Sequence, residues 1–356
     1  IYKGTAPATP LLNSQYTSSF IAGLTELRYL HCMPLENAVE YFRSHGFDLD
    51  KGTAQKLVSK VKVHLENLYK ALGQAIVADN YICGDETYQK VRLQVATPSG
   101  RKIKKGYIWV FVGMTTGLVY FFYDDGSRSA EVFEQHIKGF SGAFQCDYYS
   151  GYRHIGIGGM SGIKRLPCLQ HIKRKFLDLK DNPQAQEIAK LFGLLYHFEH
   201  QHRIGKDGWT EKDHLEWRQR YSKVMLEKIH MRLMAVKDRT GVPPDDPLLA
   251  ATEHALRQWD EIPRIFASPT YKLDNNEVER INRYISLTRR RLTIGSHSGA
   301  EAASLYHSLA ITCHRCGVNV FDYFCDIIDR CAAWPPNTPI EKYRDLLPDR
   351  WKPSQK

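Results

Sequence analysis

The spacing of apolar residues changes at about Asp79, and this change constrains the fold more than any other feature of the chain. Before Asp79 the spacing is helical, whereas after it the chain has short runs rich in aromatic and β-branched residues, which are typical of strands. The predicted strands are 78–85, 103–114, 118–123, 143–147 and 164–168, and a helix is predicted over 130–140. The pattern therefore predicts an α/β core.

One uncharged segment, Gly106 to Tyr123, is about as long as a minimal membrane span. It is rich in aromatic and β-branched residues, and Thr115-Thr116-Gly117 interrupts it. Two strands joined by a turn are therefore favoured over a membrane helix.

The N-terminal region has helical spacing over 18–32, 35–45 and 53–77, with Gly46 as a break and Thr53 as a predicted N-cap. The second and third of these helices could form a helix-turn-helix. The side chains that would then face DNA are Lys51, Thr53, Gln55, Lys56 and Lys60. A helical bundle with solvated lysines agrees equally well with the spacing.

A second group of helices is predicted over 183–202, 210–240 and 247–266. Thr210 and Asp213 have the spacing of a capping box at the start of the middle helix. This helical insertion could handle DNA, form dimer contacts or have a purely structural role.

The charge and cysteine content narrow the class of protein. Lys and Arg number 49 against 39 Asp and Glu, and the net charge of +10 fits a polyanionic partner but also an ordinary basic enzyme. Eight cysteines at irregular spacing, with no recognisable secretion signal, indicate reduced thiols in the cytoplasm. Cys313 and Cys316 are the only close pair, which is weak evidence for zinc.

Three acidic residues stand out as candidate metal ligands. Asp85 and Asp147 each follow an apolar run and are predicted to end a strand, and Glu279 lies near the start of a predicted helix. Carboxylate oxygens without His or Cys partners suit Mg²⁺ and phosphoryl transfer better than zinc. Taken singly, each acid could instead be an ordinary turn or cap residue.

The sequence around these acids resembles the insertion-sequence-66 family of bacterial transposases along nearly the whole chain. The blocks that carry the resemblance are Gly84-Asp85-Glu86-Thr87 with Lys90-Val91, Gly106 to Val112, Ser127-Arg128-Ser129, Asp147 to Tyr152, Cys168-Leu169-Gln170-His171 with Arg174-Lys175-Phe176, Asp274-Asn275-Asn276 with Glu279-Arg280, Gly295-Ser296 with Gly299-Ala300-Glu301, and Leu346 to Pro353. The pattern from Asp274 to Arg280 is the most specific of these.

The resemblance implies a DDE-type DNA transposase with a ribonuclease-H-like catalytic core built on a mixed sheet, in which Asp85, Asp147 and Glu279 hold two Mg²⁺ or Mn²⁺ ions. It also implies DNA partners (element ends and target), a homodimer or larger synaptic complex, no membrane association, and a cytoplasmic, nucleoid-associated location in a bacterium. DNA-binding elements upstream of the core in this family favour the helix-turn-helix. The family's upstream zinc-binding and coiled-coil parts are missing and the chain starts without Met, so an N-terminal part is expected to be absent.

The expected organisation has five parts. These are a helical DNA-binding region (1–77), the first part of the catalytic core (78–181), a helical insertion (182–270), the second part of the core with the active-site helix (271–332) and a C-terminal tail (333–356).

The third acid requires a choice between Glu277 and Glu279, which lie about 200° apart on a helix. If residues 275–287 are helical, Asn275, Glu279 and Arg283 share one face, and Val278, Ile281 and Ile285 form the apolar face. The resemblance assigns the metal ligand to Glu279 and leaves Glu277 as the alternative.

Basic and polar residues near the acids are the candidate DNA contacts. They are His171, Lys173, Arg174, Lys175, Asn275, Arg280, Arg283, Arg289, Arg290 and Arg291, together with Lys51, Lys56 and Lys60 of the N-terminal region. Basic runs are also common as solvated surface, and His171 could simply bond to the backbone. Two rival functions remain, a ribonuclease-H-like nuclease that only hydrolyses DNA and an inactive DNA-binding regulator.

Overall fold

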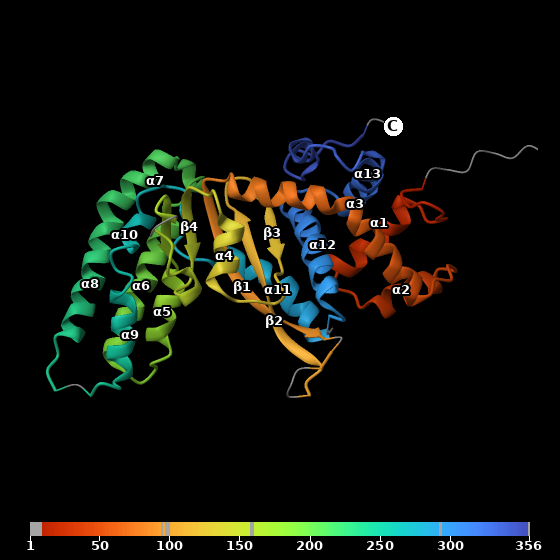
Figure 1. Cartoon of the computed structure of the whole chain (residues 1–356). Helices are drawn as coiled ribbons and strands as arrows, with labels where there is room; N and C mark the ends of the chain where they lie inside the picture. Colours follow the sequence, from red (N-terminus) through yellow and green to blue (C-terminus); the bar gives the residue numbers. More distant parts are fainter. Residues whose placement is uncertain are drawn as a thin grey trace, which may run out of the picture. The chain divides into compact units, whose positions relative to one another are not determined.

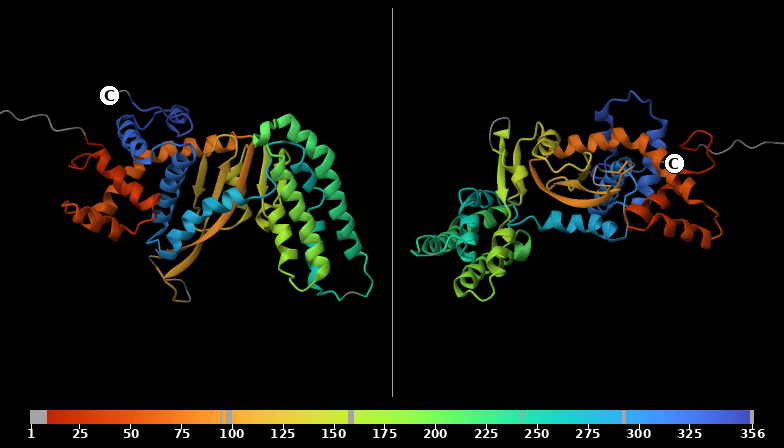
Figure 2. Two further views of the ribbon diagram at one scale, coloured as in Figure 1. Left: turned by 180° about the vertical axis from the view of Figure 1, so that it is seen from behind. Right: turned by 60° about the horizontal axis from the view of Figure 1, so that its bottom comes forward.

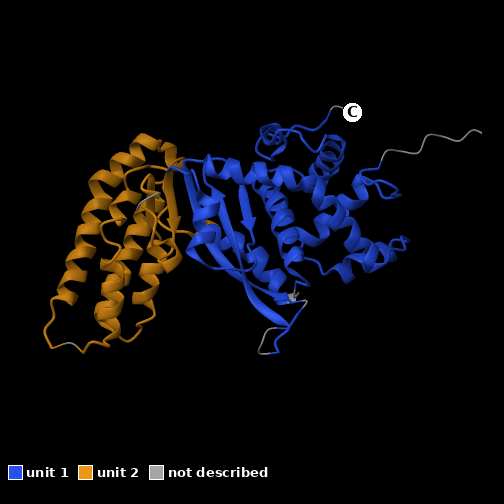
Figure 3. Ribbon diagram, in the orientation of Figure 1, with its two compact units in different colours: residues 1–141, 278–356 blue, residues 142–277 orange. Residues whose placement is uncertain are grey.

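The structure is a computed structural model that describes residues 9–93, 95–96, 100–156, 160–241, 243–291 and 294–354 (Figure 1). The chain forms two compact units, which are described separately below. Residues 1–141 and 278–356 form unit 1, and residues 142–277 form unit 2 (Figure 3).

Unit 1 contains an antiparallel set of three strands. They are β1 (Tyr81–Arg92), β2 (Ile103–Gly113) and β3 (Val119–Phe122). β1 pairs with β2 from Ile82↔Gly113 to Arg92↔Ile103, and β2 pairs with β3. The inward-facing residues of β2 and β3 are aromatic and β-branched, which fits their full burial.

The turn between β2 and β3 is held by a buried carboxylate. Asp79 Oδ2 accepts hydrogen bonds from the backbone N–H groups of Thr115 (3.3 Å) and Thr116 (3.0 Å). At Gly113 a Cβ atom would lie 2.5 Å from Thr116 Oγ1, so only glycine fits there. The predicted pair of strands is thus confirmed, and no helix in the described part of the chain is long and apolar enough to cross a membrane.

The helices of unit 1 come from both ends of the chain. They are α1 (Ser18–Tyr29), α2 (Leu35–Ser44), α3 (Lys51–Val77), α4 (Ala130–Ile137), α11 (Asn276–Arg291), which begins at the boundary with unit 2, α12 (His297–Arg315), α13 (Val320–Ala333) and the short η5 (Ile340–Leu346). α3 begins earlier than predicted, because Asp50 rather than Thr53 is its N-cap: Asp50 Oδ1 accepts from Thr53 N at 2.9 Å.

Helix α12 covers the free edge of β3 (Figure 2). The Thr312 hydroxyl accepts from Val119 N at 3.0 Å, and the Ser308 hydroxyl accepts from Phe121 N at 2.8 Å. The Tyr69 hydroxyl of α3 donates to the Phe121 carbonyl. Side chains therefore satisfy the backbone groups that a further strand would otherwise bind.

Unit 2 combines a parallel pair of strands with a set of helices. The strands are β4 (Gly142–Cys146) and β5 (Ile163–Pro167). The helical elements are η1 (Ser150–Tyr152), α5 (Leu169–Leu177), α6 (Pro183–Gln201), η3 (Lys206–Gly208), α7 (Glu211–Trp217), η4 (Arg218–Ser222), α8 (Lys223–Lys237), α9 (Pro247–Leu256) and α10 (Ile262–Ile265). The capping box predicted at Thr210 and Asp213 is present.

A buried ion pair ties the helices of unit 2 together. Arg218 lies in η4, a single π-helical turn within the stretch predicted as one helix. Its Nε and Nη2 atoms donate to Glu199 Oε2 of α6 at 2.9 and 2.8 Å, and Nη2 also donates to the Tyr271 carbonyl at 2.9 Å. Arg218 is the first residue of this turn, whose hydrogen bonds span one residue more than those of an α-helix.

The predicted mixed α/β class is confirmed, since the described strands include antiparallel and parallel pairs. The ribonuclease-H-like core, the helix-turn-helix and the five-part organisation stay predictions. No disulfide joins any of the eight cysteines, all of which lie among the described residues.

Candidate active site

The first candidate ligand, Asp85, lies inside β1 and not at its end. The prediction that the strand stops at Asp85 is wrong, because β1 continues to Arg92 and pairs with β2 from Asp85↔Val110 onward. Backbone pairing does not depend on side-chain polarity, so the polar half of the strand still forms a ladder. Side chains alternate between the two faces of a strand, which puts Asp85 on the opposite face from Glu86.

Both carboxylate oxygens of Asp85 have defined donors. Oδ1 accepts from the Glu86 backbone N–H at 2.9 Å. Oδ2 accepts from Asn282 Nδ2 of α11 at 2.7 Å. The carboxylate is therefore fixed in orientation on the face of β1 that α11 covers.

Glu86, the neighbouring acid, is occupied on the other face of β1. Its side chain is 1% exposed and pairs with Arg128, whose Nε donates to Glu86 Oε1 at 2.8 Å and whose Nη2 makes a second bond to the same oxygen. The Arg128 guanidinium also lies 5.1 Å from the centre of the Tyr107 ring. Glu86 thus holds the loop before α4 to the strand. Because side chains alternate along β1, Glu86 and Asp85 face different partners.

Helix α11 carries the second candidate ligand, Glu279. The predicted apolar face is buried, with Val278, Ile281 and Ile285 at most 4% exposed. The helix runs from Asn276 to Arg291, and Asp274 Oδ1 accepts a hydrogen bond from Asn276 N at 3.1 Å in the turn that leads into it.

The face of α11 that meets Asp85 contains a residue that sequence reasoning missed. Asn282 is 8% exposed and contacts Asp85, whereas Arg283, predicted on this face, is exposed. Glu279 lies three positions before Asn282, and residues three apart are neighbours on a helix, with Cβ atoms about 5–6 Å apart. Glu279 Oε1 is buried, and Glu277 lies in the first helical turn. The signal in the sequence was the polar Asn282 between the apolar positions Ile281 and Ile285.

Arg289 joins the far end of α11 to the same strand. Its Nη1 donates to the Tyr88 carbonyl (2.7 Å) and to Thr87 Oγ1 (3.0 Å), and its guanidinium lies 3.9 Å from the centre of the Tyr88 ring. Beyond the helix, Ile294 N donates to the Lys90 carbonyl at 3.0 Å. These contacts follow one another along both elements, so α11 runs beside β1 in the same direction.

The third candidate, Asp147, belongs to unit 2 and directly follows β4, as predicted. Its Oδ1 accepts from Tyr149 N at 2.9 Å, and its carbonyl accepts from Arg165 Nη2 at 3.1 Å. Arg165 is buried and also pairs with Glu261. The loop that carries Asp147 is thus anchored, and its carboxylate is partly exposed.

The β5–α5 junction of unit 2 lies beside the segment that leads into α11. Asn275 N donates to Cys168 Sγ at 3.3 Å, and Leu169 N donates to the Leu273 carbonyl at 3.0 Å. Burial raises the pKa of the Cys168 thiol to about 12, and that of Cys146, next to Asp147, to about 12. Both thiols are therefore neutral at pH 7 in the metal-free protein.

The donor set fits a hard divalent cation. Among the described residues, no three His, Cys, Asp or Glu side chains converge on one point. Mg²⁺ does not require such a cage, because it keeps several waters and is usually bound by one or two carboxylates together with substrate phosphates. Asp85 and Glu279 supply two such carboxylates within unit 1, because Glu279 lies one helical turn from Asn282, the residue that donates to Asp85.

The predicted DNA contacts fall into two groups. Arg174, Lys175, Arg283 and Arg290 are exposed and have no acidic partner in the described part of the chain, and Lys56, Lys60 and Arg280 are also exposed. Three others make internal contacts: Lys51 pairs with Glu36, Lys173 lies 5.4 Å from the centre of the Tyr196 ring, and Arg289 binds β1. His171 lies in α5 with its Nδ1 atom buried, and Asn275 is buried. The side chain of Arg291 lies outside the described residues.

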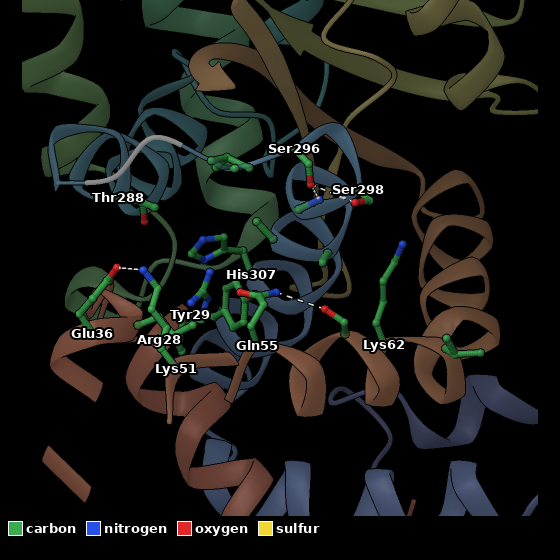
Figure 4. Close-up of a pocket in the computed structure, with 18 of the residues that line it drawn as sticks. Arg28, Tyr29, Glu36, Lys51, Gln55, Lys62, Thr288, Ser296, Ser298 and His307 are labelled. Carbon is green, nitrogen blue, oxygen red and sulfur yellow. Dashed lines mark hydrogen bonds and ion pairs between the residues drawn. The ribbon is translucent and has the colours of Figure 1, made fainter. Parts of the chain in front are cut away.

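A cavity of about 680 Å³ in unit 1 is separate from these acids (Figure 4). Residues of α1, α3 and α12 line it, among them Arg28, Lys51 and Lys62. Acids balance two of these cations, because Lys51 pairs with Glu36, and Lys62 lies 3.1 Å from Glu301. The cavity is therefore not a basic groove.

Comparisons with known proteins identify the family of the chain. A family model described as the IS66 family of transposases matches residues 13–302. Three proteins of Sinorhizobium fredii (strain NBRC 101917 / NGR234) are similar. The uncharacterized protein y4jD is 26% identical over all of this chain and 70% of its own length. The uncharacterized protein y4hP is 25% identical over 90% of this chain and 59% of its own length. The uncharacterized protein y4qI is 24% identical over 99% of this chain and 66% of its own length. The family model covers most of the chain, including the blocks around Asp85, Asp147 and Glu279, and the chain therefore belongs to the IS66 family of transposases.

Proposed function

We propose that this transposase cleaves the ends of an insertion sequence and joins the freed 3′-OH to target DNA, with Asp85, Glu279 and Asp147 as the ligands of two Mg²⁺ or Mn²⁺ ions. The observation that carries the proposal is the 2.7 Å contact between Asn282 and Asp85, because it puts the Glu279 face of α11 beside the Asp85 carboxylate. Asp147 is the ligand that unit 2 would supply.

The reaction consists of two phosphoryl transfers. In the first, the oxygen of a water molecule bonds to the scissile phosphorus, the P–O3′ bond breaks, and a 3′-OH and a 5′-phosphate are left. In the second, that 3′-OH bonds to a phosphorus of target DNA and displaces the target's own 3′ oxygen. The bound ions would lower the pKa of the attacking hydroxyl and neutralise charge on the leaving oxygen.

The chain's own residues have separate tasks. Asp85 and Glu279 hold the ions in unit 1, Arg289 fixes α11 along β1, and the exposed Arg174, Lys175, Arg283 and Arg290 bind DNA phosphates. We further propose a ribonuclease-H-like core, a DNA-binding role for the α2–α3 region, and a dimer or larger complex that brings two element ends together. The supporting features are the order of strands and helices and the exposed Lys56 and Lys60 on α3.

Substitution of the acids tests the metal site. Asp85→Asn and Asp147→Asn should abolish cleavage of a labelled element end in Mg²⁺ and leave DNA affinity nearly unchanged, because the amide keeps the shape but removes the charge. Asp345→Asn, at an acid of unit 1 whose side chain is 79% exposed, is the matched control and should cleave normally. Wild-type rates in Asp85→Asn or Asp147→Asn would contradict the assignment.

A pre-cleaved end separates transposition from simple hydrolysis. Supplied with such an end and a target plasmid, the wild-type protein should yield a joined product. Cleavage of intact ends without any joined product would instead identify a nuclease.

A further inference from the structure

The second contact of the Asp85 carboxylate suggests a residue that tunes the metal site. Asp85 accepts hydrogen bonds only, so the Asn282 atom that faces it at 2.7 Å is the amide nitrogen, and the amide oxygen points elsewhere. That oxygen is buried and has no hydrogen-bond partner among the described residues. A buried acceptor of this kind usually binds a protein donor or an ordered water.

Several contacts besides this amide hold α11 to β1. The buried apolar face of the helix, the Arg289 contacts with β1 and the Ile294–Lys90 hydrogen bond hold it at points before and after Asn282. A purely structural role would be met by any apolar side chain at this position, as at Ile281 and Ile285. A polar side chain that is 8% exposed is costly to bury unless its polar atoms are used.

Helix geometry places Asn282 beside Glu279 on α11. Glu279 lies one turn before Asn282 on the same stripe of α11, about 4.5 Å back along the helix axis at a rise of ~1.5 Å per residue. The amide nitrogen of Asn282 thus faces Asp85, and Glu279 lies one turn before Asn282 on the same helix. Ligands of a metal are commonly oriented by such outer partners, which also bond to metal-bound waters.

We propose that Asn282 is a positioning residue of the metal site: its amide nitrogen sets the orientation of the Asp85 carboxylate, and its amide oxygen accepts a hydrogen bond from a water on the divalent cation. This inference rests on the proposed function, because it assumes that Asp85 is a metal ligand. It assigns to Asn282 an effect on metal affinity and no contact with DNA.

Direct Mn²⁺ binding tests the proposal without relying on activity. Mn²⁺ titrations of the full chain, followed by the electron paramagnetic resonance signal of the free ion, should show affinity about 10–100-fold weaker in Asn282→Leu and Asn282→Ala, as is typical for loss of an outer partner. Two variants are needed, because Asn282→Leu fills the site while Asn282→Ala leaves room for water. Leu287→Ala, at an exposed position of the same helix, should bind Mn²⁺ like the wild type.

Kinetics provide a second readout that a structural role would not change. The Mg²⁺ concentration for half-maximal cleavage should rise in Asn282→Ala by a similar factor, and the rate at saturating Mg²⁺ should recover most of the wild-type value. DNA affinity measured in EDTA should be unchanged.

The outcomes separate this inference from the proposed function. If Asp85→Asn loses Mn²⁺ binding while both Asn282 variants bind as tightly as the wild type, Asn282 has no positioning role. If Asp85→Asn itself binds Mn²⁺ like the wild type, the metal site is misassigned and the proposed function fails with it.

Discussion

Arg289 and Arg290 are adjacent in a run of arginines, and the structure predicts opposite effects when each is replaced. Arg289 binds β1 through the Tyr88 carbonyl, the Thr87 hydroxyl and the Tyr88 ring. Arg290 is exposed and has no acidic partner in the described part of the chain. Arg289→Ala should therefore weaken the fold around the site, and Arg290→Ala should weaken DNA binding.

The contacts of Arg289 set the size of the first effect. A hydrogen bond from a charged donor contributes about 1.5–3 kcal/mol when buried. Because Arg289 is partly exposed, we take roughly half of the lower value for each of its two hydrogen bonds. The contact with the Tyr88 ring adds about 0.5–1 kcal/mol. The total of ~2 kcal/mol corresponds to a fall in Tm of about 4–8 °C for a folding unit of 150–250 residues. Arg290→Ala should change the unfolding free energy by less than about 0.5 kcal/mol.

The second effect appears in the salt dependence of DNA binding. Loss of one phosphate contact should make the slope of log K against log salt shallower by about 0.9. Fluorescence anisotropy with a labelled element end at several salt concentrations should show this for Arg290→Ala and an unchanged slope for Arg289→Ala. Thermal unfolding of the same samples measures the predicted fall in Tm.

The reverse pattern would refute this reasoning. If Arg289→Ala kept the wild-type Tm and lowered the salt slope, Arg289 would be a phosphate contact and α11 would be held to β1 by other residues. Cleavage adds a further check, because a shift of about 1 Å in a site can reduce the rate about 100-fold, so Arg289→Ala should cleave slowly even at saturating DNA.

Three further predictions concern the acid on α11, the helices of unit 2 and a buried histidine. Glu279→Gln should stop both end cleavage and strand transfer in a plasmid-based transposition assay, whereas Glu277→Gln should retain most activity; the reverse result would move the ligand to Glu277. Arg218→Met should lower the unfolding free energy by about 3–5 kcal/mol, because it leaves the Glu199 carboxylate buried without its partner. The double variant Arg218→Met with Glu199→Gln should recover part of that loss in urea unfolding. Equal losses in the single and the double variant would show that the pair is not coupled. Burial lowers the pKa of His307 from 6.5 to about 4, so the unfolded state binds more protons than the folded state between these two pH values. The unfolding free energy should therefore fall by up to about 3 kcal/mol as the pH is lowered through that window. His307→Gln should flatten this pH dependence, and an unchanged pH slope would exclude His307 as its source.

The elements of the fold could be predicted from the sequence where one periodicity dominates. The strands β2 and β3 are apolar nearly throughout, and the apolar face of α11 recurs at helical spacing, so both were found. β1 was cut short because its second half is polar, and its pairing partner was needed to show that the ladder continues past Asp85. The π-turn at Arg218 depends on a buried partner far along the chain, which local spacing does not report.

The candidate site shows a similar division. The acids could be selected from their neighbours in the sequence and from the resemblance. The structure adds that the alternation of β1 directs Glu86 to Arg128 and Asp85 to Asn282. Asn282 and the anchoring role of Arg289 depend on contacts between residues distant in the chain, and a basic run looks the same whether its members bind DNA or the protein itself.

The hydroxyl groups on α12 that cover the edge of β3 have a consequence for self-association. An exposed edge strand is a template on which another chain can add a strand, and assemblies built in this way are difficult to limit in size. Ser308 and Thr312 occupy the backbone groups of Phe121 and Val119 on that edge, so strand addition there would require α12 to leave first. While α12 stays in place, this edge is therefore closed to strand addition by another copy, and it cannot nucleate an open-ended fibre when copies of the protein crowd together.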